Sequence, residues 1–221
     1  MESEITNRLN DAVSNWFTLL NSGIQYAYFY KVYPPTCGFE LTDEELYHRF
    51  LIWSFDNYPE WISSIPRWEA VSVISARLKE KLLSDFYDLL IDLTFVCIPA
   101  STPEENRMRY EEFSNDLCMD LGMINAYPYI AYKDASTNKQ DGNVEDSLDR
   151  LLFDERFFYG KNILLFDDTL TTGMTIRNFA NKLYSFGANI IAAITIGITC
   201  NERYKFPNQL AYWDITSMIE E

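Results

Sequence analysis

The chain contains one histidine and few basic residues, and each shortage excludes a class of function. His48 is the only histidine among 221 residues, so a histidine-based catalytic triad is not expected. Lysines and arginines number 18 against 33 aspartates and glutamates, which gives a formal net charge of −15. A surface this acidic repels the phosphate backbone of DNA or RNA. We therefore expect no nucleic-acid partner.

The sequence also lacks the motifs of several common metal, membrane and nucleotide sites. Its four cysteines form no C-x-x-C pair, so we expect buried reduced thiols rather than a zinc ribbon. No apolar run approaches the length of a membrane span, and the acidic start of the chain lacks the basic and apolar regions of a signal peptide. Neither G-x-G-x-x-G nor G-x-x-x-x-G-K-S/T occurs. These observations predict a cytoplasmic protein with no membrane partner.

Apolar residues are plentiful, since 48% of the chain is hydrophobic and 16% aromatic. Residues 1–90 show helical spacing, and we predict helices over 3–22, from Thr42 onward, and over 66–86. The aromatic stretch at 26–30 is expected in a core or an interface rather than as a base-stacking platform. We predict a helical accessory region over 1–90 and the main domain over 91–221. The aromatic N-terminal region favours a homodimer.

Residues after position 90 alternate between strand and helix patterns. We predict strands over 93–98, 126–132, 162–166 and 189–198, and helices over 104–121, 147–153 and 174–186. This alternation is typical of an α/β fold with a parallel sheet flanked by helices. Ligands bind such sheets beyond the carboxyl ends of the strands, where segments 99–102 and 167–175 fall. The polar stretch 133–146 has the composition and length of a lid.

Two acidic residues and a threonine-rich turn follow the strand predicted at 162–166. Asp167 and Asp168 offer acceptors to a vicinal diol or ligands to Mg²⁺, provided that the strand has ended there. Thr171, Thr172 and Thr175 surround Gly173 at the start of the next helix, where hydroxyls and backbone amides suit a phosphate. A sugar phosphate is the ligand that needs both sets of groups close together.

Segment 163–175 reads Ile-Leu-Leu-Phe-Asp-Asp-Thr-Leu-Thr-Thr-Gly-Met-Thr and closely resembles the phosphoribosyl pyrophosphate (PRPP) motif of the type I phosphoribosyltransferases. The resemblance implies that family's fold for the main domain, with residues 1–90 as an N-terminal helical region. It implies that Asp167 and Asp168 contact the ribose hydroxyls. The 5′-phosphate loop would comprise Thr169, Leu170, Thr171, Thr172, Gly173, Met174 and Thr175.

Other parts of the chain match the family by position. The resemblance implies a pyrophosphate loop at Ala100, Ser101 and Thr102, a lid over 133–146 carrying Lys133 and Lys139, and Mg²⁺ held mainly by PRPP and water. Arg107 lies nearer the pyrophosphate loop than Arg109, so we predict that Arg107 is the arginine that reaches it. Within the family the stretch is similar to the competence-associated ComF-like branch, without that branch's cysteine-rich zinc module.

The resemblance implies Mg²⁺-dependent transfer of ribose 5-phosphate from PRPP to a nitrogen nucleophile, a nucleobase or an amine, with release of pyrophosphate. An alternative is a non-catalytic module that senses PRPP or a nucleotide and binds a protein through residues 1–90. A phosphoacceptor or Mg²⁺-phosphatase domain of doubly wound type also ends strands in acid pairs. Such domains place their acids early, whereas this pair comes late in the chain.

Overall fold

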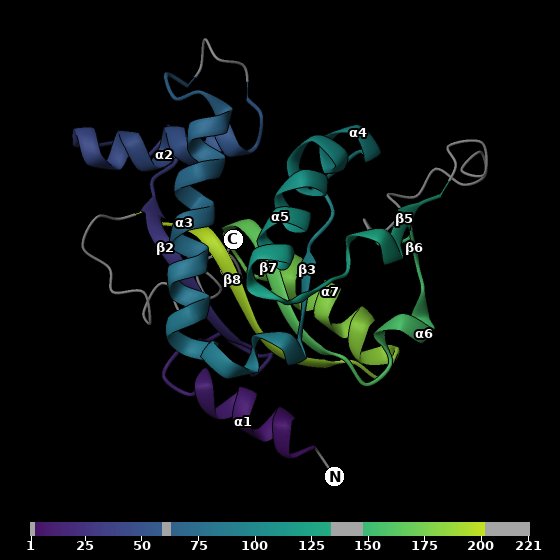
Figure 1. The fold of residues 1–221 in the computed structure, drawn as a ribbon. Helices are drawn as coiled ribbons and strands as arrows, with labels where there is room; N and C mark the ends of the chain where they lie inside the picture. Colours follow the sequence, from purple (N-terminus) through teal and green to yellow (C-terminus); the bar gives the residue numbers. More distant parts are fainter. Residues whose placement is uncertain (1–2, 59–62, 134–147, 202–221) are drawn as a thin grey trace.

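The computed structural model describes residues 3–58, 63–133 and 148–201. Six strands form one sheet in the order β1-β2-β8-β7-β3-β4, parallel throughout except for the antiparallel edge pair β1–β2 (Figure 1). A second, antiparallel pair consists of β5 and β6. The bounds are β1 (Phe17–Thr18), β2 (Gln25–Val32), β3 (Leu93–Cys97), β4 (Ile124–Asn125), β5 (Ile130–Tyr132), β6 (Leu151–Phe153), β7 (Asn162–Leu170) and β8 (Asn189–Thr199).

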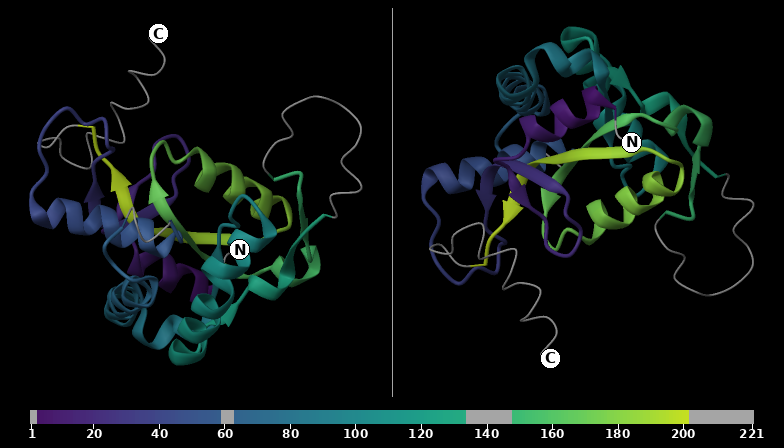
Figure 2. Two further views of the ribbon diagram at one scale, coloured as in Figure 1. Left: turned by 90° about the horizontal axis from the view of Figure 1, so that it is seen from above. Right: turned by 90° about the horizontal axis from the view of Figure 1, so that it is seen from below.

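Helices cover both faces of the large sheet, as the views from above and below show (Figure 2). One face packs against α1 (Glu4–Ala12), α2 (Asp43–Phe55), α3 (Arg67–Phe86) and α5 (Glu112–Leu121), and the other against α7 (Met174–Ser185). Shorter helical segments are α4 (Pro103–Asn106), α6 (Glu155–Phe158), η1 (Tyr87–Asp92), η2 (Arg107–Glu111) and η3 (Tyr127–Tyr129). The prediction of a mostly parallel sheet flanked by helices is confirmed. None of the helices in these ranges is long and apolar enough to cross a membrane.

The N-terminal region contains a strand of the large sheet, so the prediction of helices throughout residues 1–90 is wrong. The helix predicted over 3–22 ends at Ala12, and β1 and β2 follow. β2 pairs in parallel with β8, and Tyr26 and Tyr30 are buried in the core. Aromatic residues favour a pleated, half-buried surface, and β8 supplies the partner. The expected core role of the aromatic stretch is confirmed.

Three predicted segments after residue 90 also differ from the structure. Residues 126–132 begin with the turn η3 and become strand only at β5. Residues 151–153 form strand β6 rather than part of a helix, because they pair with β5. The strand predicted to end at 166 continues to Leu170, because β8 runs beside it that far. The stretch predicted as a lid lies outside the described residues except for Lys133.

The carboxyl ends of β2, β3, β7 and β8 meet at one edge of the sheet. The chain passes from β3 outward to β4 and later returns to place β7 on the other side of β3. This reversal is a topological switch point, where open parallel sheets bind ligands. The C-terminus of α2 reaches the same edge because Gly197 of β8 lets that helix lie close. A Cβ at Gly197 would lie 2.6 Å from Cδ1 of Ile52.

Candidate functional site

The two acids of β7 lie where the strand has lost one of its neighbours. β3 pairs with β7 only as far as Cys97 and Phe166, after which the amide of Ile98 donates to the Phe166 carbonyl. Asp167 and Asp168 therefore pair on the β8 side alone. Both line a cavity of about 770 Å³ that extends to the loop after β3. The condition that the strand end before the acids is not met, because β7 continues to Leu170; both acids nevertheless reach the cavity from a stretch whose β3 edge is unpaired.

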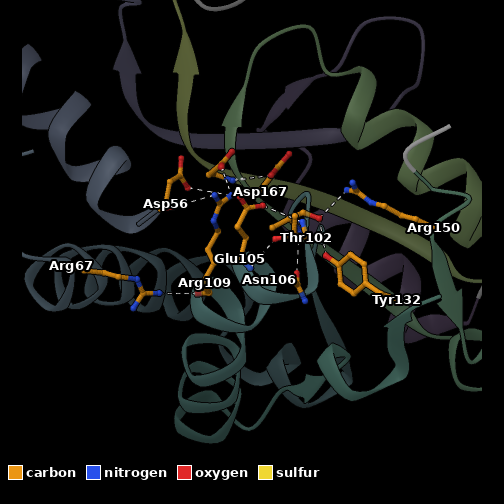
Figure 3. Close-up of polar contacts among 11 residues, drawn as sticks. Asp56, Arg67, Thr102, Glu105, Asn106, Arg109, Tyr132, Arg150 and Asp167 are labelled. Atoms are coloured by element: carbon orange, nitrogen blue, oxygen red, sulfur yellow. Dashed lines mark hydrogen bonds and ion pairs between the residues drawn. The ribbon is translucent and has the colours of Figure 1, made fainter. Parts of the chain in front are cut away.

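Asp168 faces the side of the sheet that carries α2, α5 and η2. Its Oδ2 accepts a hydrogen bond from Nη1 of Arg109 at 2.9 Å. The same Arg109 nitrogen lies 3.4 Å from Oδ1 of Asp56, the residue that caps the C-terminus of α2. Figure 3 shows the Arg109 side chain extending toward Asp56 and Asp167. The Arg109 guanidinium thus contacts carboxylates from α2 and β7, which are far apart in the sequence.

Asp56, Asp167, Asp168 and Arg109 form a partly buried charged cluster at the cavity wall. Burial, followed by the charge of Asp168, raises the pKa of Asp56 well above its ordinary value. The same two causes, in the same order, raise the pKa of Asp167. Burial alone would lower the pKa of Arg109, but Asp56, Tyr110 and Asp168 together raise it. Arg109 therefore stays charged, and Asp56 and Asp167 hold protons more tightly than surface carboxylates do.

A π-helical turn positions Arg109. Residues 107–111 form η2, and such turns occur frequently at functional sites. Nη2 of Arg67, on α3, donates to the carbonyl oxygens of Met108 at 2.5 Å and Arg109 at 3.3 Å. Nε of Arg109 and the Tyr110 hydroxyl are buried and have no hydrogen-bond partner. Both atoms belong to residues that line the large cavity.

Asp167 and Thr169 face the opposite side, toward the threonine-rich turn. Together with residues 170–173, 175 and 176 they line a small cavity of about 70 Å³. Gly173 caps α7 at φ 73°, and a Cβ there would lie 2.5 Å from Cδ1 of Leu19. Because the N-cap residue is a glycine, it has no side chain to cap α7. The Met174 amide makes only a long contact of 3.4 Å with the Thr172 hydroxyl. The N-terminus of α7 therefore presents amides to an anion beside the acids.

Side chains from outside the loop after β3 hold it in place by hydrogen bonds to the loop backbone. The Ala100 carbonyl accepts from the Tyr132 hydroxyl at 2.8 Å and from Nη2 of Arg150 at 2.9 Å. Arg150 also donates from Nη1 to the Ser101 carbonyl at 2.7 Å. The Ala100 amide is bound by the side chain of Asn106 at 3.1 Å. Ala100 and Ser101 of the predicted pyrophosphate loop line the large cavity.

Thr102 has a different task from the one predicted. Its hydroxyl accepts from the Glu105 amide at 3.2 Å, and its amide donates to the Glu105 carboxylate at 3.1 Å, which forms a capping box at the start of α4. Thr102 does not line the cavity. The cap fixes Thr102 at the start of α4, outside the cavity lining.

The choice of Arg107 over Arg109 is wrong. Arg107 is exposed and pairs with Glu104 at 2.9 Å, whereas Arg109 lines the cavity. Lys133 is also exposed and outside the cavity lining, and its backbone amide donates to the Arg150 carbonyl at 2.8 Å. Sequence reasoning missed Asp56 and Arg150. Their positions depend on the packing of α2 and on the pairing of β5 with β6, and no local motif marks either residue.

The acid pair suits the way in which proteins commonly bind Mg²⁺. Within residues 3–58, 63–133 and 148–201, no group of three or more His, Cys, Asp or Glu side chains has the geometry to hold a metal ion. Mg²⁺ is usually bound by one or two carboxylates together with substrate phosphates and water. Asp167 and Asp168 supply that number of carboxylates at the cavity wall.

Comparison with known proteins adds no relative: no family model matches the chain, and no curated protein matches it either. The function must therefore be inferred from the motif and from the geometry of the site.

Proposed function

We propose that the chain has a type I phosphoribosyltransferase-like fold. It transfers ribose 5-phosphate from PRPP to a nitrogen nucleophile, a nucleobase or an amine, and releases pyrophosphate. One observation carries this proposal. Asp167 lines both the large cavity and the small one, so carboxylates suited to a diol lie directly beside a helix terminus suited to a phosphate. This juxtaposition, at the switch point of a parallel sheet, matches the two ends of a ribose 5-phosphate.

Each group has a separate task in the proposed reaction. The amides and hydroxyls at 171–175 bind the 5′-phosphate, with the terminus of α7 favouring its charge. Asp167 and Asp168 accept hydrogen bonds from the ribose hydroxyls. Ser101 and the charged Arg109, both in the lining of the large cavity, receive the pyrophosphate. Mg²⁺, when bound, neutralises the charge that develops on the leaving group.

Calorimetry with PRPP and Mg²⁺ tests this proposal. We expect micromolar affinity for the wild type and a loss of at least about 2 kcal/mol for Asp167→Asn/Asp168→Asn, since charge-assisted hydrogen bonds are removed. Asp88→Asn is the matched control, because Asp88 is exposed and pairs with Arg8 at 2.7 Å, away from the cavity. Equal affinity in the wild type and the double variant would contradict the proposal.

A non-catalytic sensor of PRPP or a nucleotide is the second candidate, with residues 1–90 contacting a protein partner. Thr102 favours it, because Thr102 does not line the cavity and the loop there has one hydroxyl fewer for pyrophosphate than predicted. Only the transferase would convert PRPP and release pyrophosphate. Pyrophosphate release from PRPP with ammonia or any nucleobase would exclude the sensor.

A further inference from the structure

We propose that Asp56 accepts the proton that the nitrogen nucleophile loses during transfer, and that the nucleophile lies in a second cavity beside Asp56. This inference rests on the proposed transfer reaction and adds a catalytic residue to it. Asp56 belongs to the region before residue 90, outside every motif that the sequence resembles.

The second cavity has a volume of about 310 Å³ and shares a wall with the large one. Asp56, Tyr58, Asp168 and Thr169 line both cavities. The remaining lining of the second cavity is mostly apolar or aromatic: Val32, Tyr33, Pro34, Pro35, Arg49, Ile52, Trp53 and Thr199. Flat rings and prolines suit a planar heterocycle, and acids on the shared wall suit a ligand that presents N–H groups.

The transfer reaction requires a proton acceptor on that shared wall. The nitrogen lone pair forms the bond to C1 of the ribose, and the C1–O bond breaks with its electron pair leaving on pyrophosphate. The nucleophile is then positively charged and must lose its N–H proton. A carboxylate within hydrogen-bond reach of the nitrogen can receive it.

Of the three carboxylates at the site, Asp56 is the least committed. Asp168 is held by Arg109 at 2.9 Å, and Asp167 accepts the Asp168 amide at 3.0 Å and faces the threonine-rich turn. Oδ1 of Asp56 is buried and lies 3.4 Å from Nη1 of Arg109, and the Asp56 carboxyl group also contacts that of Asp168. Asp56 lines both cavities and keeps 11% of its side chain exposed, so its carboxyl group can be reached from their junction.

The fold also holds Asp56 in place. It ends α2, and its amide donates to the Ile52 carbonyl. Ile52 packs against Gly197 of β8, where no larger residue fits without a shift. Nη2 of Arg109 approaches the Asp56 carbonyl at 3.4 Å. The carboxylate is thus carried by a helix docked on the sheet.

The decisive experiment compares Asp56→Asn with the wild type in two assays. Calorimetry with PRPP and Mg²⁺ should give a dissociation constant within about threefold of the wild type. Pyrophosphate release should be measured with ammonia and with a panel of purine and pyrimidine bases, and kcat should fall by about 10²–10⁴-fold. Asp120→Asn, which removes an exposed carboxylate paired with Lys79, is the control and should change neither quantity.

A further readout separates proton transfer from a merely structural role. Formate should restore part of the rate in Asp56→Ala by supplying a carboxylate, and it should not stimulate the wild type. Thermal melting of each variant shows that it is folded, and Asp56→Ser replaces any variant that is not.

The outcomes distinguish this inference from the proposed function. Wild-type turnover in Asp56→Asn, or the absence of formate rescue, would overturn the role of Asp56 and leave the transferase intact. PRPP binding by the wild type without pyrophosphate release from any nucleophile would also overturn that role, since no proton would then be transferred. Absence of PRPP binding by the wild type would overturn both proposals.

Discussion

Arg109 and Asp168, 59 positions apart in the sequence, form an ion pair with Nη1 2.9 Å from Oδ2, and only 16% and 21% of the two side chains are exposed. Asp56, with 11% of its side chain exposed, places Oδ1 3.4 Å from the same Arg109 nitrogen. A pair so removed from water loses much of its Coulomb energy to desolvation, but removal of one partner leaves an uncompensated buried charge. Arg109 should therefore be the residue on which both stability and ligand binding at this site depend.

Arg109→Met should lower the free energy of unfolding at neutral pH by about 3–5 kcal/mol, because Asp56 and Asp168 lose their common cation. Urea denaturation followed by circular dichroism measures this loss. Arg107→Met is the matched control: it removes an exposed arginine two positions away, and its urea midpoint should equal that of the wild type. An equal loss of unfolding free energy in both variants would show that the buried ion pair stabilises the fold no more than an exposed arginine does.

Stability should fall as pH rises through the titration of Asp56 and Asp167. Both folded-state pKa values are raised above the ordinary value of 3.8. The contribution is therefore fully present below that value and is lost as pH rises through the folded-state pKa. Where one such acid titrates, the slope approaches about 1.4 kcal/mol per pH unit.

The net charge of −15 also weakens the fold as pH rises, so the comparison must be made with a variant. Asp56→Asn should be more stable relative to the wild type at pH 8 than at pH 5. Urea unfolding of both proteins between pH 4.5 and 8 measures the difference. Parallel curves would mean that Asp56 titrates alike in the folded and unfolded chains.

Gly173→Ala should destabilise the protein and weaken PRPP binding. The new methyl group would meet the buried side chain of Leu19, and the backbone would keep its left-handed φ of 73°. Gly122→Ala is a control for strain alone, because φ is 70° there and no atom lies within 4 Å of the added Cβ. Thermal melting should place Gly173→Ala about 1–3 kcal/mol below this control, and calorimetry should show reduced PRPP affinity for Gly173→Ala only.

Arg150→Met should loosen the loop after β3. Its two hydrogen bonds to the Ala100 and Ser101 carbonyls are lost, and we expect destabilisation by about 1–3 kcal/mol. PRPP affinity should fall as well, since the loop lines the cavity. Arg156→Met, at an exposed position on α6, is the control for loss of one positive charge. An unchanged PRPP affinity in Arg150→Met would show that this loop does not contribute to PRPP binding.

Local sequence patterns predicted the parts of the fold that local forces determine. The apolar runs at β3, β7 and β8 and the helical spacing of α7 identified the parallel sheet, because a strand buried on both faces reads as a continuous apolar run. The acids and the threonine-rich turn could be placed at one sheet edge because β7 leads directly into α7. Neither inference needed knowledge of distant contacts.

The remaining parts depend on contacts between segments far apart in the chain. β2 is a strand because β8 pairs with it, and nothing near residue 25 reveals that partner. Asp56 reaches the acids because α2 docks at Gly197. Arg109 rather than Arg107 faces the cavity, and both belong to the π turn η2, which α3 contacts through Arg67. The sequence does not mark such a turn.

The pairing of Gln25 with Ala192 has a consequence for the order in which the protein forms. A ribosome delivers β2 early and its parallel neighbour β8 nearly last, so the buried tyrosines of β2 must wait for most of translation before they are covered. We expect the nascent chain to depend on chaperones during this interval. We also expect a fragment that begins at residue 91 to aggregate, because it would expose the full edge of β8 that β2 normally covers.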